Sequence, residues 1–204
     1  MISRFDKNIK MKIVFLITTL ILSTGVLARQ KPYYYQIPDT PAVYTAANVA
    51  ARMIDGLGFR YYWATDGLTE KDMNFKPGDN TRTTFETLEH INGLTKVLLN
   101  AVSGTSTKSG GTDKKISFAQ IRSETLTNIQ TASEILKKPE NKLEGFDMIF
   151  ERQNGSITRY PFWNLINGPI ADSIWHVGQV VSFRRSSGNP FPEGVNVLQG
   201  TKSD

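Results

Sequence analysis

The chain has 204 residues, of which 39% are apolar and 21% charged, and it contains no cysteine. This composition is that of one globular domain rather than of a disordered chain. The lack of cysteine excludes disulfides, thiolate nucleophiles, lipid-anchored lipoproteins and thiolate zinc sites, so a metal would have to be held by histidine and carboxylate.

Residues 1–28 have the three-part pattern of a secretory signal peptide. A basic leader precedes an apolar run from Ile13 to Leu27, and Val26-Leu27-Ala28 predicts cleavage before Arg29. A membrane anchor is the rival interpretation, but the run is shorter than the roughly 20 residues that a spanning helix needs. We therefore expect a periplasmic or secreted protein with no membrane segment after cleavage, and Met11 is an alternative start.

The net charge of the chain argues against a nucleic-acid partner. The formal value of +5 falls to +2 without residues 1–28, which hold four Lys/Arg and one Asp. A nucleic-acid-binding protein would be expected to carry a basic stripe. The remaining chain has only short basic pairs such as Lys137-Lys138, which are typical of solvated faces.

The first half of the expected domain predicts two helices. Residues 29–41 contain three prolines and Tyr33–Tyr35, which predicts an extended lead-in with the tyrosines packing on the surface of the domain. From Ala42 to about Thr65 apolar residues recur at helical spacing, with Thr40 as cap and Pro41 in the first turn. Residues 66–81 have loop composition. A second helix is predicted from Thr83 or Thr84 to Val102.

A flexible connection rich in Gly, Ser, Thr and Lys is expected at residues 103–115. A third helix should begin after Ser117 as N-cap and end before Pro139. Residues 146–160 alternate apolar and polar positions around Asn154-Gly155, which predicts a short β-hairpin or an extended loop. The last helix is predicted from Pro161 to Ser186, with Pro169 either starting or kinking it.

These elements predict an all-α, up-down four-helix bundle over residues 42–190, with a short β-hairpin before the last helix and a polar C-terminal tail at 191–204. The last helix is apolar in nearly all directions, which indicates a buried helix. A homodimer interface along it would account for the same pattern.

The chemical feature of the last helix is Asp172-Ser-Ile-Trp-His176. Asp172 and His176 are four residues apart and share one helix face. Spacing alone favours a structural hydrogen-bonded pair. The alternative is a metal site completed by His90, the only other histidine. Two histidines and one carboxylate form a recurrent divalent-metal arrangement.

The stretch from Asn167 to Pro190, with Trp175-His-Val-Gly-Gln179 at its centre, resembles the last helix of the DinB/YfiT-like family of metalloenzymes. The segment around His90 resembles the histidine on the second helix of that family. The resemblance implies a divalent metal held by one histidine on the second helix and a His-x-x-x-His pair on the last. His90 and His176 match, and Asp172 stands in place of the first histidine of the pair, which implies a two-His-one-Asp site for Zn, Ni, Fe or Mn.

Several other residues have two interpretations. Gln179 is expected to pack the helix rather than to hydrogen-bond near the site. Arg184 and Arg185 are expected to pair with carboxylates of the bundle rather than to bind an anion. Glu86 is either a partner of His90 or an exposed helix residue, and Trp175 and Phe183 are expected in the core.

The expected function is that of an exported, DinB-like, divalent-metal-dependent enzyme, a hydrolase or transferase acting on a small molecule. Metal-assisted hydrolysis is favoured because the thiol cofactor of the family's transferases fits poorly with export. A bundle that binds a ligand or partner without catalysis is the alternative.

Overall fold

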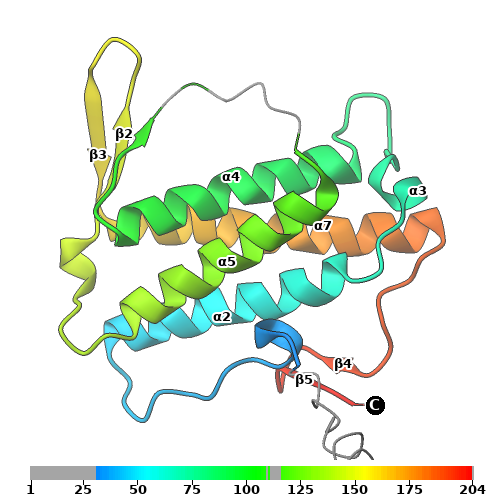
Figure 1. Ribbon diagram of the computed structural model, residues 1–204, viewed down its shortest axis with the longest axis horizontal. Helices are drawn as coiled ribbons and strands as arrows, with labels where there is room; N and C mark the ends of the chain where they lie inside the picture. The colour runs from blue at the N-terminus through cyan, green and yellow to red at the C-terminus, as the bar shows by residue number, and fades with distance from the viewer. Residues whose placement is uncertain (1–30, 109, 111–115, 204) are drawn as a thin grey trace, which may run out of the picture. The chain divides into compact units, whose positions relative to one another are not determined.

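The computed structural model describes residues 31–108, 110 and 116–203, and the predicted signal peptide lies outside these residues. The described part is mainly helical, with a small sheet at one end of the helices (Figure 1). In chain order the elements are η1 (Tyr33–Tyr35), α2 (Ala46–Thr65), α3 (Glu70–Met73), α4 (Thr84–Val102), β1 (Thr107–Lys108), α5 (Phe118–Leu136), η2 (Leu143–Gly145), β2 (Met148–Glu151), β3 (Ile157–Tyr160), α6 (Phe162–Leu165), η3 (Ile166–Ile170), α7 (Ala171–Ser187), β4 (Val195–Asn196) and β5 (Thr201–Lys202).

The long helices α2, α4, α5 and α7 bury one common core. Helix α5 packs against α2 and α4, and α7 packs against the same two helices. Side chains such as Ile54, Leu88, Ile129 and Val180 are almost fully buried between them. The prediction of a mainly helical fold is therefore confirmed, with the small sheet added to it.

Helix starts follow side-chain caps. The predicted start of α4 at Thr83 or Thr84 and the predicted cap of α5 at Ser117 are confirmed, because Thr83 and Ser117 each form a reciprocal capping box with the residue three positions on. The predicted start of α2 at Ala42 is wrong. Thr45, and not Thr40, caps this helix by accepting a hydrogen bond from the Asn48 amide.

The predicted β-hairpin is confirmed. Strands β2 and β3 pair in antiparallel register, with Phe150 opposite Thr158, and the turn between them contains Gly155 at φ 79°. Strand β1 adds to the other edge of β2 in parallel. The segment after α4 is thus joined to the segment before α6, which keeps these two parts of the chain together.

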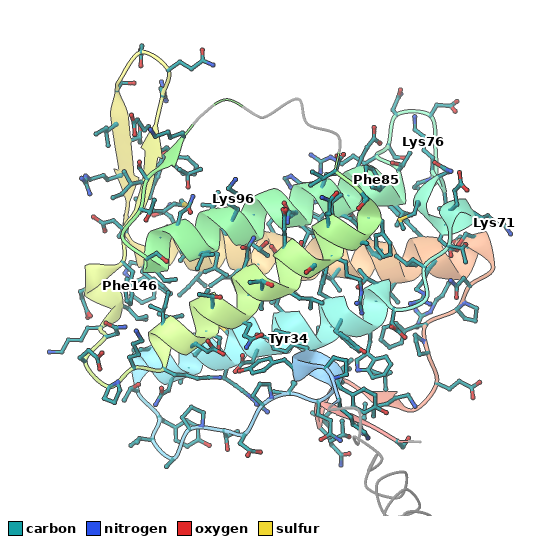
Figure 2. The ribbon with its side chains drawn as sticks, viewed as in Figure 1. Tyr34, Lys71, Lys76, Phe85, Lys96 and Phe146 are labelled. Carbon is teal, nitrogen blue, oxygen red and sulfur yellow. The ribbon has the colours of Figure 1, made fainter. Side chains whose placement is uncertain are left out.

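One tyrosine of the lead-in belongs to the core. Tyr33–Tyr35 were expected to pack on the surface of the domain, and Tyr34 lies deeper than this, because it is 2% exposed and points toward α2 (Figure 2). Its hydroxyl donates to the buried Asp55, which also pairs with Lys137 at 2.6 Å. Gly58 makes room for the ring, because a Cβ there would lie 2.4 Å from it. Burial, with the negative charge of Asp55, raises the pKa of Tyr34 well above its usual range.

A buried cation joins the C-terminal ends of α2 and α7. Arg184 is 2% exposed, and its Nη1 donates to the carbonyl oxygens of Trp63 and Ala64, both at 3.0 Å. Its Nε and Nη2 donate to the backbone and side-chain oxygens of Asn189. These bonds satisfy carbonyl groups that the last turn of α2 leaves without helical partners. Gly188, at φ 97°, ends α7 and allows the chain to turn back.

Asp72 of α3 is the acidic member of the same network. Its carboxylate accepts hydrogen bonds from Ser187, from Asn189 at 2.7 Å and from the backbone amide of Thr69 at 2.8 Å. Burial alone would raise the pKa of Asp72. The hydrogen bonds from Asn189, Ser187 and Thr69 together outweigh burial and hold the pKa of Asp72 well below its usual range.

The last helical segment has close to the predicted bounds, but more of its surface is exposed than predicted. Helical structure is continuous from Phe162 to Ser187, and Pro169 lies in the π-helical segment η3. The expectation that this helix is buried nearly all round is wrong, because Trp175 is 69% exposed. Phe183 contacts Phe75 with ring centroids 6.0 Å apart.

The predicted polar tail folds back on the domain. Strands β4 and β5 form a small antiparallel hairpin, and the amide of Ile37 in the lead-in donates to the carbonyl of Gly200 at 2.8 Å. Within the part of the chain that the structure describes, no helix is long and apolar enough to cross a membrane.

Replacing Asp72 by Asn should destabilise the fold at neutral pH and flatten its acid dependence. The folded-state pKa of Asp72 lies below that of the unfolded chain, so the stabilisation is present above the unfolded value of about 4 and is lost as the pH falls through the folded value. We expect Asp72→Asn to lower the free energy of unfolding at pH 7 by about 2 kcal/mol, since the hydrogen bonds to a charged acceptor are lost. Urea unfolding at pH 7 and pH 3 measures both effects, with the exposed Asp79→Asn as control. An equal loss at the two pH values would contradict this role.

Candidate metal centre

His90 is presented by α4 on the side that faces α7. The Thr83–Glu86 capping box fixes the start of α4, and the two helices are in direct contact. Neighbouring Leu88 and Ile91 are fully buried, which holds the helix in a rotation that leaves His90 at the edge of the core. Its side chain is 32% exposed.

Asp172 and His176 lie on the first two turns of α7, directly after η3. Pro169 has no backbone N–H to continue an α-helical ladder. The chain forms a wider turn here, in which the Ala171 amide donates to the carbonyl of Ile166 five residues back. The hydroxyl of Ser173 donates a hydrogen bond to the Pro169 carbonyl at 2.6 Å. This turn sets the rotation of α7 and directs Asp172 and His176 toward α4.

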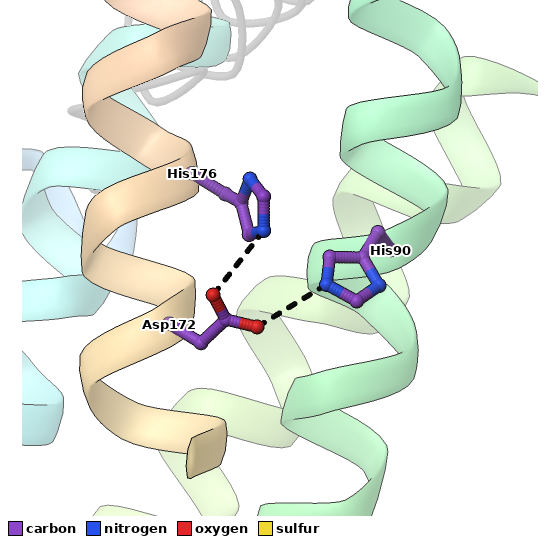
Figure 3. Close-up of side chains that lie close together, drawn as sticks. All are labelled: His90, Asp172 and His176. Carbon is purple, nitrogen blue, oxygen red and sulfur yellow. Dashed lines mark hydrogen bonds and ion pairs between the residues drawn. The ribbon is translucent and has the colours of Figure 1, made fainter. Parts of the chain in front are cut away.

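The structure brings the three predicted residues together (Figure 3). The Asp172 carboxylate lies between the two rings, with Oδ2 at 3.2 Å from His90 Nε2 and Oδ1 at 3.3 Å from His176 Nε2. The imidazole rings meet edge to face, with centroids 4.6 Å apart. The expected Asp172–His176 pair is therefore present, but His90 belongs to the same cluster.

The cluster has the composition and spacing to hold a metal ion. One ligand atom from each residue can be chosen so that all lie within 4.8 Å of one another. Ligand atoms at about 2.1 Å from a common metal are separated by roughly 3.0–3.5 Å in tetrahedral or octahedral geometry. The two carboxylate–imidazole distances, each to a different oxygen of Asp172, fall in this range. Metal binding would require the remaining separations, of up to 4.8 Å, to close to the same range.

Gln179 fixes the orientation of His176. Its Oε1 lies 2.7 Å from His176 Nδ1, one helical turn further along α7. With Gln179 Oε1 and Asp172 Oδ1 both acceptors, a neutral ring can donate to only one of them. Donation from Nδ1 to Gln179 leaves the Nε2 lone pair directed at the cluster, as a metal ligand requires. The expectation that Gln179 only packs the helix is wrong, and the three-residue spacing from His176 was the signal for its role.

The cluster is open on one side. The side chains of His90 and Asp172 are each 32% exposed, whereas that of His176 is 12% exposed. Trp175, expected in the core, lies beside His176 with the two rings nearly parallel and 6.3 Å apart. Three protein ligands with solvent access leave coordination positions for water or another molecule.

Other residues singled out in the sequence serve structural roles. The exposed Glu86 carboxylate accepts a hydrogen bond from the Thr83 backbone amide at 2.7 Å and forms no hydrogen bond or ion pair with His90. Neither Arg184 nor Arg185 lies within ion-pair distance of a carboxylate among residues 31–108, 110 and 116–203, so the expected pairing is wrong for both. Arg184 binds backbone carbonyl groups instead, because its burial places it beside the end of α2.

No protein-family model, curated protein or solved structure matches this chain. Its function is therefore inferred from the residues of the site.

Removing the hydrogen bond that Gln179 accepts from His176 should weaken metal binding without unfolding the helix. We expect Gln179→Leu to lower the affinity for Zn²⁺ or Ni²⁺ by about tenfold to a hundredfold, because the imidazole of His176 loses the acceptor that fixes its orientation. Competition with a chromophoric chelator measures the affinity. Gln130→Leu, which removes an amide that bonds Glu134 on α5, is the matched control. An unchanged affinity in Gln179→Leu would show that Gln179 does not orient the ligand.

Proposed function

We propose that this chain is an exported metalloprotein of DinB-like type, an up-down four-helix bundle in which His90, Asp172 and His176 bind one divalent metal ion. The observation that carries the proposal is the convergence of both histidines of the sequence on a single carboxylate. His90 and Asp172 are 82 residues apart in the sequence, so local helix geometry alone does not bring them together. The order and mutual contacts of α2, α4, α5 and α7 support the bundle assignment.

The ligand set selects among metals by donor type. Two imidazole nitrogens and one carboxylate oxygen suit Zn, Ni, Fe or Mn, whereas magnesium and calcium prefer all-oxygen sites. Such an ion, when bound, would supply Lewis acidity toward water or a carbonyl or phosphoryl oxygen. This chemistry supports a hydrolase acting on a small molecule, and a transferase is the alternative reaction class.

The residues of the chain have separate roles in this proposal. His90 and His176 would each supply Nε2 as a ligand atom, from two different helices. Asp172 supplies a negative charge that offsets the positive charge of the metal ion. Gln179 holds the proton on His176 Nδ1. Trp175 places an exposed aromatic ring beside His176, where it can contact a substrate.

A bundle that binds a ligand or partner without catalysis is the second candidate. The observation in its favour is that the cluster uses both histidines of the sequence, which leaves no third histidine as a general base. A homodimer formed along the exposed part of α7 belongs to this candidate, with Trp175 in the interface.

Metal content separates the proposal from a metal-free structural cluster. Protein purified without a polyhistidine tag is expected to contain about one transition-metal ion per chain by elemental analysis, and His176→Ala is expected to lose it. Glu89→Ala, next to His90 but outside the cluster, should retain the metal. No metal in either the wild-type protein or the control, even after incubation with Zn²⁺, would overturn the proposal. Metal-loaded protein that hydrolyses no ester, amide or phosphoester in a panel would favour the second candidate.

Export is tested by the N-terminus of the protein recovered outside the cytoplasm. We expect the mature chain to begin at Arg29, because Val26-Leu27-Ala28 has the small-residue pattern that signal peptidase requires. Mass spectrometry of the intact protein measures the start. Replacing Ala28 by a bulky residue should leave an uncleaved precursor, and full-length protein confined to the cytoplasm would contradict export.

A further inference from the structure

An apolar groove lies along α2, separate from the metal cluster. It encloses about 520 Å³, within the range of small-molecule sites. The floor is one face of α2 that includes Val49, Met53 and Gly56, spaced three and four residues apart. The lead-in and the C-terminal hairpin contribute the other walls, with Ile37 and Leu198 among their residues.

Exposed apolar side chains are concentrated at this groove. Among the described residues, six of the eleven exposed large apolar side chains line it: Val43, Tyr44, Val49, Met53, Val197 and Leu198. Single exposed apolar residues are ordinary, but a contiguous group around a cavity marks a binding surface. Tyr44 and Leu198, at 96% and 93% exposure, have almost no contact of their own in the free chain.

The groove is also positively charged. Of the described residues that line it, Arg52 and Arg60 are the only charged ones. Neither lies within ion-pair distance of a carboxylate in the described ranges 31–108, 110 and 116–203. Arg52 donates from Nη1 to the Pro38 carbonyl at 2.7 Å, and Arg60 donates from Nη1 to the Gly56 carbonyl at 3.0 Å. Each guanidinium has five N–H donors, so both retain donors for an anion.

Gly56 makes room for the Arg60 guanidinium one helical turn closer to Arg52. Arg52 and Arg60 are two helical turns apart on α2, but the side chain of Arg60 folds back one turn to Gly56. A Cβ at position 56 would lie 3.1 Å from Arg60 Nη1. The missing side chain therefore leaves the space that the guanidinium fills.

The groove and the metal cluster occupy different sides of α7. Ile174 lines the groove and lies midway between Asp172 and His176 in the sequence. Two residues correspond to a rotation of about 200° around a helix axis, so Ile174 faces nearly opposite to Asp172. A ligand in the groove would leave the metal ligands uncovered.

We propose that this groove binds a small amphipathic carboxylate, of the class of medium-chain fatty acids. Its apolar body lies against Val49, Met53 and Leu198, and its carboxylate accepts hydrogen bonds from Arg52 and Arg60. Carboxylates form bidentate pairs with guanidinium groups, so the site prefers an anionic ligand to a neutral or cationic one. The surrounding apolar side chains give it a preference for an aliphatic body over a hydrophilic acid. This site is independent of the proposed metalloenzyme activity.

Calorimetric titration of the purified protein with dodecanoate below its micelle concentration tests the site. We expect one molecule bound per chain, with dodecanol and dodecyltrimethylammonium at least tenfold weaker. Arg52→Gln and Arg60→Gln should each weaken dodecanoate binding by about tenfold, as expected for loss of a hydrogen bond to a charged group. Arg159→Gln, which removes an exposed charge on β3, is the control for net charge and should bind as the wild type does.

A second pair of variants separates loss of charge from loss of fold. Val49→Glu places a carboxylate next to Arg52 and should abolish dodecanoate binding, whereas Val49→Gln at the same exposed position should reduce it only slightly. Both should melt as cooperatively as the wild type. His176→Ala should bind dodecanoate normally, which distinguishes this site from the metal cluster.

Three results would overturn the inference. Equal affinity for dodecanoate, dodecanol and the dodecyl cation would mean that the arginines do not recognise the ligand. Binding to anionic phospholipid vesicles that dodecanoate does not displace would assign the groove to a membrane surface. A dimer in sedimentation that Val49→Glu dissociates, with no dodecanoate bound by the wild type, would assign it to a second copy of the chain.

Discussion

The buried guanidinium of Arg184 determines where α7 lies along α2. A buried cation is stable only when its donors are used, and Arg184 uses them on the last carbonyl groups of α2 and on Asn189. A shift of α7 by one residue would leave both the guanidinium and these carbonyl groups without partners. Asp172 and His176 lie on the same helix, two to three turns before Arg184. Their position opposite α4 therefore depends on an interaction at the other end of α7.

The metal ligands also depend on the turn that precedes them. Proline inside a helix usually produces a kink, but here η3 widens and the chain continues as one helical segment. An α-helical path through the same residues would rotate the following helix by about 100° for each residue gained or lost. Such a rotation would move Asp172 away from His90. Arg184 fixes α7 at its end and η3 fixes it at its start, and the three ligands meet because both constraints hold.

Local sequence signals predicted where the helices and strands lie better than they predicted which residues surround the site. Thr83 with Glu86 and Ser117 with Gln120 are short-range patterns, so the starts of α4 and α5 followed from the sequence. The start of α2 did not, because Thr40-Pro41 offers a second plausible cap and only the packing of the lead-in decides between them. The grouping of His90 with Asp172 and His176 was reached through the small number of histidines and the family resemblance. Periodicity could not provide it, because it says nothing about which helix faces which.

The errors share a physical cause. Trp175 and Arg184 were assigned by residue type, the indole to the core and the guanidinium to ion pairs with carboxylates of the bundle. Their environments are set by tertiary contacts that a single helix pattern does not contain: Trp175 lies on the uncovered side of α7, and Arg184 lies against the end of a helix more than a hundred residues earlier. Gln179 differs, because its contact with His176 is local and its spacing was visible in the sequence.

The parallel pairing of β1 with β2 has a consequence for the order of folding. His90 and Asp172 are 82 residues apart, and joining them directly would close a long loop at a large cost in chain entropy. Thr107 pairs with Phe150 across a shorter stretch of chain, and the β2–β3 hairpin is more local still. Once these strands have paired, the end of α4 and the start of the last helical segment are already neighbours. The folding route with the smallest loss of chain entropy then forms the sheet first and the α4–α7 contact afterwards. On this route the three ligands are among the last groups to reach their native positions.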